Sequence, residues 1–73
     1  MTIDQLRALA EHATLRLSKG ENAFVHVEGL PRPILVKEIS VNEQDFTLDV
    51  LVHNGSSLYR IAPGRVVAVQ LSK

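Results

Sequence analysis

The chain has 73 residues, of which 45% are hydrophobic, and its eight basic and eight acidic side chains cancel. A chain of this length forms one domain with a small core, and the absence of cysteine excludes disulfide bonds and thiolate metal sites. No basic or acidic tail indicates a nucleic acid or a membrane as partner, and no apolar run approaches the ~20 residues that span a bilayer. We therefore expect one soluble, cytoplasmic domain over residues 1–73.

Residues 2 to 19 have the pattern of an amphipathic helix. Thr2 and Gln5 have the spacing of a capping box, in which each side chain bonds the backbone of the other residue, and Gly20 follows the last turn. The apolar stripe of this helix comprises Ile3, Leu6, Leu9, Ala10, Ala13 and Leu17. One apolar stripe predicts that the helix covers one face of a sheet.

Two strands are expected next, over residues 23 to 28 and 34 to 41. The loop between them contains Pro31 and Pro33, which cannot donate a hydrogen bond to a neighbouring strand. The second strand begins with apolar residues on both faces, and we expect the helix to cover one of these faces.

A third strand is expected over residues 44 to 52, followed by a tight hairpin. Apolar residues alternate with mostly polar ones here, which is the period of a strand with one buried face. This alternation places Phe46 in the core with Leu48 and Val50. The Asn54-Gly55 pair then supplies the positive φ angles that a tight hairpin turn requires.

The last two strands are expected over residues 58 to 62 and 65 to 71, separated by Pro63-Gly64. The fifth strand is apolar on both faces at Val66, Val67, Ala68 and Val69. An exposed apolar strand at the edge of a sheet favours pairing with another chain. The pattern therefore indicates self-association.

One helix followed by five short, strongly bent antiparallel strands predicts a mainly β domain. The fold class that we expect is an SH3-like barrel over residues 22–71, preceded by the helix over residues 2–19.

This order of elements resembles that of the Sm-like proteins, the superfamily that includes the bacterial RNA chaperone Hfq. The first Sm motif, with its acidic residue and its base-contacting residue, is matched by Ile39, Glu43, Phe46, Thr47, Leu48 and Val50. The segment from Tyr59 to Val67 is similar to the Hfq stretch Tyr-Lys-His-Ala followed by two valines. The resemblance implies a non-catalytic, Sm-like barrel that forms a homo-oligomeric ring and binds RNA or another oligonucleotide. A weaker resemblance, to the WYL ligand-sensing domain, covers Tyr59 to Val69.

Three positions depart from the Sm-like pattern. Ile61 stands where Hfq has the histidine of its central pore, Pro63-Gly64 replaces Arg-Gly, and Thr47 stands where many members have asparagine. The altered pore favours a second interpretation, an SH3-like protein-interaction or regulatory adaptor that does not bind nucleic acid. The sequence leaves both interpretations open.

The candidate residues for nucleic-acid binding are Arg60, Arg65, Thr47 and Tyr59. The two arginines flank the Pro-Gly break and would stand at one end of the barrel, with Thr47 near them in the Sm-like layout. Guanidinium groups bind phosphate or stack on bases, although a simple ion pair, for example with Asp49, is the alternative. Tyr59 would stack on a base or seal a contact between subunits.

The expected ring contact pairs the last two strands with those of a neighbouring copy. The apolar residues that we expect in this interface are Leu58, Ile61, Val66, Val67 and Val69.

No catalytic residue, metal site or cofactor is expected. No pair among His12, His26 and His53 has the short spacing of a metal site. Asp45 and Asp49 would lie roughly 13 Å apart along a strand, too far for an acid and base pair. The sequence therefore does not predict an enzyme.

Overall fold

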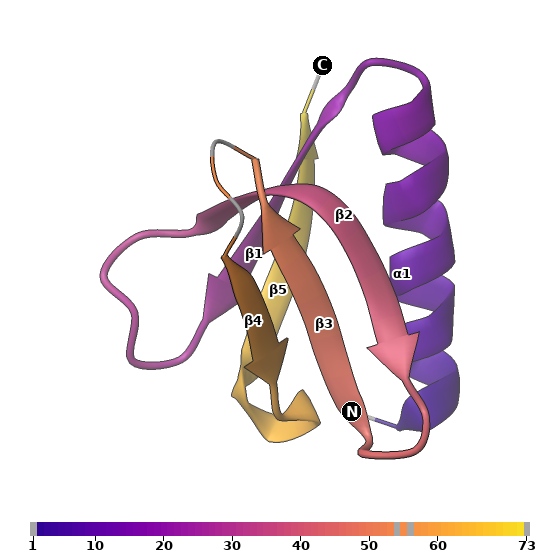
Figure 1. Cartoon of the computed structure of the whole chain (residues 1–73), viewed down its shortest axis with the longest axis vertical. Helices are drawn as coiled ribbons and strands as arrows, with labels where there is room; N and C mark the ends of the chain where they lie inside the picture. Colours follow the sequence, from indigo (N-terminus) through magenta and orange to yellow (C-terminus); the bar gives the residue numbers. More distant parts are fainter. Residues whose placement is uncertain (1, 54, 56, 73) are drawn as a thin grey trace.

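A computed structural model describes residues 2–53, 55 and 57–72 (Figure 1). The elements in chain order are α1 (Ile3–Ser18), β1 (Asn22–Val27), β2 (Ile34–Asn42), β3 (Thr47–Val52), β4 (Leu58–Ile61) and β5 (Val66–Ser72), with a 3₁₀ turn, η1 (Pro63–Arg65), before β5. The predicted mainly β domain with an N-terminal helix is confirmed. No helix within the described ranges is long and apolar enough to cross a membrane.

Local sequence signals define both ends of α1. The Thr2 side chain accepts a hydrogen bond from the Gln5 backbone N–H at 3.2 Å, and the Gln5 side chain accepts one from the Thr2 N–H at 2.8 Å. The predicted capping box is therefore confirmed. At the other end Gly20 has a φ of 82°, in the left-handed region that glycine adopts without strain, and its N–H bonds the carbonyl of Leu17.

The five strands form one antiparallel sheet in the order β4-β3-β2-β1-β5. The long strand β2 pairs with two neighbouring strands along different parts of its length. Residues Ile34–Val36 pair with β1, whereas Val36–Asn42 pair with β3. A bulge between Val36 and Glu38 marks the change, and bulges bend the strand that contains them.

The sheet is open, so the predicted barrel is not confirmed. Strands β4 and β5 are the two ends of the sheet, and no pairing between them occurs in the part of the chain that the structure describes. The short strand β4 ends at Ile61, and η1 then carries the chain to the opposite edge, beside β1.

The predicted core position of Phe46 is wrong. Strand β3 begins only at Thr47, and Phe46 has a φ of 52° and is 44% exposed. The cause is the preceding turn, in which the Asn42 side chain accepts hydrogen bonds from the backbone N–H groups of Gln44 and Asp45. Beyond this turn, Leu48 and Val50 are fully buried, as the alternation predicted.

The hairpin predicted at Asn54-Gly55 lies partly outside the described residues. The antiparallel pairing of β3 with β4 nevertheless confirms that the chain reverses its direction between these strands.

The core lies between α1 and one face of the sheet, and α1 runs alongside β2 (Figure 1). It is entirely aliphatic, and its buried residues are Leu6, Ala10, Ala13, Ala23, Val25, Val36, Ile39, Leu48, Val50, Ile61 and Val66. The helix contributes two alanines to this set, and such small side chains let its backbone approach the sheet. The small core makes each large member important for stability.

A matched pair of leucines on α1 tests this assignment of the core. Leu6 is fully buried and Leu15 is 51% exposed. We expect Leu6→Ala to lower the free energy of unfolding by about 2–5 kcal/mol, because it leaves a cavity. Leu15→Ala should lower it by less than about 1 kcal/mol. Urea unfolding followed by circular dichroism measures both, and equal losses would contradict the described packing.

Candidate functional site

Three of the four predicted binding residues lie on the two strands next to one sheet edge, and two of them share a face. Asp49 of β3 is paired with Arg60 of β4, and Thr47 lies two residues from Asp49, so all three side chains are on the outer face. The Arg60 guanidinium is 3.8 Å from Asp49 and 3.5 Å from Asp45, measured between the nearest nitrogen and oxygen atoms. The Thr47 hydroxyl donates a hydrogen bond of 2.8 Å to Asp49.

This outer cluster places two carboxylates around one guanidinium. The ion pair with Asp49 is therefore present, and a phosphate at Arg60 would have to compete with both aspartates. The Arg60 side chain is 57% exposed, so the pairs contribute little to stability.

Tyr59 does not join this cluster. Neighbouring residues of a strand point to opposite faces, and Tyr59 is paired with the buried Val50, which places it on the face opposite to Arg60. Its ring borders a shallow hollow together with Pro33 and His53. The structure therefore does not bring the predicted stacking residue and Arg60 onto one surface.

Arg65 occupies the last position of η1, and its side chain is exposed. Its backbone carbonyl accepts a hydrogen bond of 2.8 Å from the Glu28 N–H, which ties the turn to the end of β1. No ion pair involves Arg65 within the described ranges of the chain. The two predicted arginines therefore differ. Arg60 forms ion pairs with two aspartates, whereas Arg65 forms none with the described carboxylates.

The residues predicted for a subunit interface divide into two groups. Ile61 and Val66 are buried in the core of this chain. Leu58 on β4 is 56% exposed and Val67 on β5 is 66% exposed, whereas Val69 is half-buried. The exposed members thus lie on the two opposite edge strands of the sheet.

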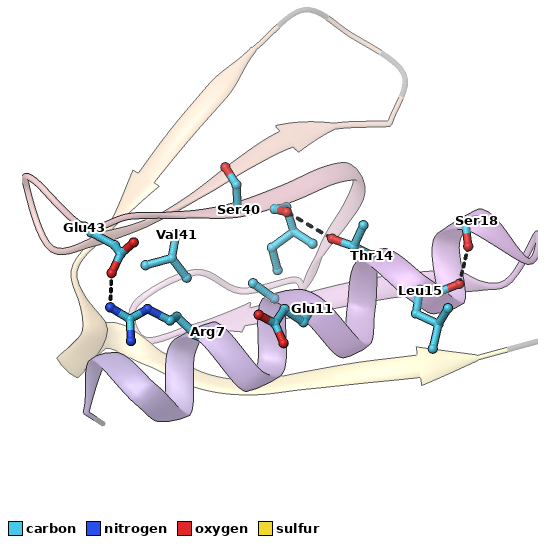
Figure 2. Close-up of a pocket in the computed structure, with 10 residues that line it drawn as sticks. Arg7, Glu11, Thr14, Leu15, Ser18, Ser40, Val41 and Glu43 are labelled. Carbon is cyan, nitrogen blue, oxygen red and sulfur yellow. Dashed lines mark hydrogen bonds and ion pairs between the residues drawn. The ribbon is translucent and has the colours of Figure 1, made fainter.

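A groove that the sequence did not reveal runs between α1 and the second half of β2 (Figure 2). Its volume is about 580 Å³, and its lining is mainly apolar, with Ala10, Leu15, Ile39 and Val41 among the lining residues. Its walls are far apart in the sequence, so no local pattern predicts it. The one feature of the sequence that could have indicated this groove is Leu15, an apolar residue outside the predicted apolar stripe of the helix.

Polar contacts bridge the groove at two places (Figure 2). The Thr14 hydroxyl donates a hydrogen bond of 3.2 Å to the backbone carbonyl of Ile39. Toward the start of α1, Arg7 forms an ion pair with Glu43 and another, of 2.9 Å, with Asp4. The hydrogen bond and the charge of Glu43 raise the pKa of Arg7 above its ordinary value.

The three histidines form no metal site with the carboxylates. Among residues 2–53, 55 and 57–72, no group of three or more histidine, aspartate and glutamate side chains is close enough to hold a metal ion. His26 instead contacts the Gln70 side chain at 3.0 Å, which joins β1 to β5.

Comparison with known proteins found no matching family model, no matching curated protein and no matching solved structure. The resemblance to the Sm-like superfamily therefore depends on the residues quoted above and on the order of the elements.

The bond between Thr14 and Ile39 can be tested by removing the hydroxyl. We expect Thr14→Val to lower the free energy of unfolding by about 0.5–1.5 kcal/mol, because it leaves a partly buried carbonyl without its partner. Thr14→Ser retains the donor and should preserve more of the stability. Urea unfolding of the two variants makes the comparison, and a Thr14→Val protein as stable as the wild type would show that the bond contributes nothing.

Proposed function

We propose that this domain is a non-catalytic module of the Sm-like type that assembles with copies of itself. The observation that carries the proposal is the presence of two open strand edges at opposite ends of one sheet, with Leu58 exposed on β4 and Val67 exposed on β5. An open edge presents unpaired backbone donors and acceptors, which another strand can satisfy. Pairing β4 of one copy with β5 of the next would satisfy both edges.

Such a contact joins two different surfaces. Contacts of this kind produce closed rings when the rotation between subunits closes, and filaments when it does not. A ring leaves no edge exposed and adds buried apolar area to a domain whose own core is small. We therefore favour a homo-oligomeric ring.

The ligand that we propose for the ring is RNA or another oligonucleotide. Arg65 would supply the main phosphate contact, because no described carboxylate pairs with it. Repetition around a ring would create a collar of positive charge although the net charge of each copy is zero. Thr47, Arg60 and Tyr59 remain candidates for further contacts.

The second candidate is an SH3-like interaction or regulatory adaptor that does not bind nucleic acid. The observation that favours it is the position of Arg60 between Asp45 and Asp49, where carboxylates would repel an approaching phosphate. The zero net charge also favours this alternative.

Assembly can be tested by placing a charge on the β5 edge. Light scattering should give the wild type a mass that is a multiple of 8.1 kDa. Val67→Lys should reduce that mass, because a lysine on an edge strand opposes pairing with another chain. His12→Lys, on the exposed surface of α1, is the matched control and should leave the mass unchanged. A wild type of 8.1 kDa at all concentrations would refute the proposed assembly.

Nucleic-acid binding can be tested by filter binding with single-stranded RNA over a series of salt concentrations. Each lost phosphate contact should reduce the slope of log affinity against log salt by about 0.7. We expect Arg65→Ala to show this reduction and Arg60→Ala to show less of it, because aspartates already pair with Arg60. If the wild-type protein retains no RNA on the filter at low salt, the proposal of nucleic-acid binding is refuted and the adaptor is supported.

A further inference from the structure

The second half of β2 has one long side on which no strand is paired. Strand β1 pairs with β2 only over Ile34–Val36, whereas β3 continues along β2 as far as Asn42. Beyond Val36, the side of β2 that faces away from β3 is occupied by α1, and the groove lies between the two (Figure 2). This stretch is an open strand edge inside the groove.

The direction of the backbone groups along this edge follows from one hydrogen bond. The Ile39 carbonyl accepts the Thr14 hydroxyl, so it points toward α1 and away from β3. Residues two apart in an antiparallel strand direct their N–H and C=O groups to the same side. The N–H and C=O of Val41 therefore also point toward the groove, and no described residue across this edge forms a backbone hydrogen bond with them.

The walls of the groove add apolar surface and negative charge. Ala10, Leu15 and Val41 supply apolar area, and Glu11 lies on the helix wall between the two bridging contacts (Figure 2). Glu11 forms no ion pair within the described part of the chain. Arg7 pairs with Glu43 and also with Asp4, which does not line the groove. Among the lining residues the structure describes, two carboxylates, Glu11 and Glu43, face one guanidinium, that of Arg7, which leaves one negative charge in excess.

We propose that the groove binds an extended segment of a partner protein, which adds as a short strand along the open edge of β2. Backbone hydrogen bonds to Val41 would align the segment, and an apolar side chain would enter the groove. A neighbouring lysine or arginine would lie beside Glu11, where the negative charge attracts it. The open stretch accepts about three residues, because the contacts of Arg7 and Thr14 bound it and a strand rises ~3.3 Å per residue.

Access requires little rearrangement. Arg7 and Glu43 are both about half exposed, so their ion pair opens at small cost when the segment enters. The bond between Thr14 and Ile39 can persist, because it uses the carbonyl of Ile39 and none of the groups of Val41. The site is separate from the edges of β4 and β5, so the inference holds whether or not copies assemble.

The probe for this site is the five-residue peptide Val-Lys-Val-Lys-Val, acetylated at its N-terminus and amidated at its C-terminus. Titrated into ¹⁵N-labelled protein, it should shift the amide signals of Val41, Glu11 and Thr14 and slow the hydrogen exchange of the Val41 amide. Glu11→Gln should weaken binding about two- to fivefold. Glu28→Gln removes the same charge outside the groove and should leave the affinity unchanged.

Two modified peptides separate strand addition from other modes of binding. A peptide with glutamate in place of lysine should not bind, and equal binding would refute the role of the acidic rim. A peptide N-methylated at its central valine should also fail, because it cannot donate to the Val41 carbonyl. Unchanged affinity of that peptide would refute strand addition.

The positions of the shifted signals decide the occupant. Shifts confined to β4 and β5, or no shifts at millimolar peptide, would overturn the inference. Shifts of the groove residues on raising the protein concentration alone would identify a second copy as the occupant and also overturn it. Light scattering reports self-assembly separately, so failure of this inference is distinguishable from failure of the proposed function.

Discussion

The divided pairing of β2 is the constraint from which the other features follow. Its first residues complete the pair with β1, and the bulge between Val36 and Glu38 turns the remainder toward β3 alone. Beyond this bulge, β2 has no neighbouring strand on the side away from β3, and its apolar face requires a covering element. The helix α1 supplies the cover, because Leu6, Ala10 and Ala13 are buried against the sheet and Thr14 satisfies the carbonyl of Ile39.

The same division determines where unpaired backbone remains. Strands β4 and β5 end the sheet on its two sides, and the second half of β2 forms an inner edge beside α1. The outer edges carry exposed apolar side chains at Leu58 and Val67, which favours copies of the same chain as partners. The inner edge has a carboxylate at Glu11 and room for only a few residues, which favours a short basic segment. The two kinds of edge therefore suit different partners.

Three arginines of this domain are balanced by carboxylates close to them. Arg7 lies between Asp4 and Glu43, Arg16 is 3.2 Å from Glu21, and Arg60 contacts two aspartates. Paired guanidinium groups on a surface contribute little to stability and compete poorly for phosphate while their carboxylates remain close. Arg65, like Arg32, is not part of any ion pair among the described residues. The net charge of the chain is zero, so each functional proposal depends on single arginines. The unpaired Arg65 favours binding of an oligonucleotide, whereas the paired Arg60 favours the adaptor.

The sequence by itself determined the elements whose signals are short-range. The capping box of Thr2 and Gln5 acts within one helical turn, and the alternation that buries Leu48 and Val50 has a period of two residues. Phe46 continued that alternation but lies outside the strand, because the side chain of Asn42 holds the preceding turn. Only the tertiary structure decided that the sheet stays open and that a groove separates α1 from β2. Those features depend on contacts such as Thr14 to Ile39 and Arg7 to Glu43, which join residues 25 and 36 positions apart, and no periodic pattern encodes such distances.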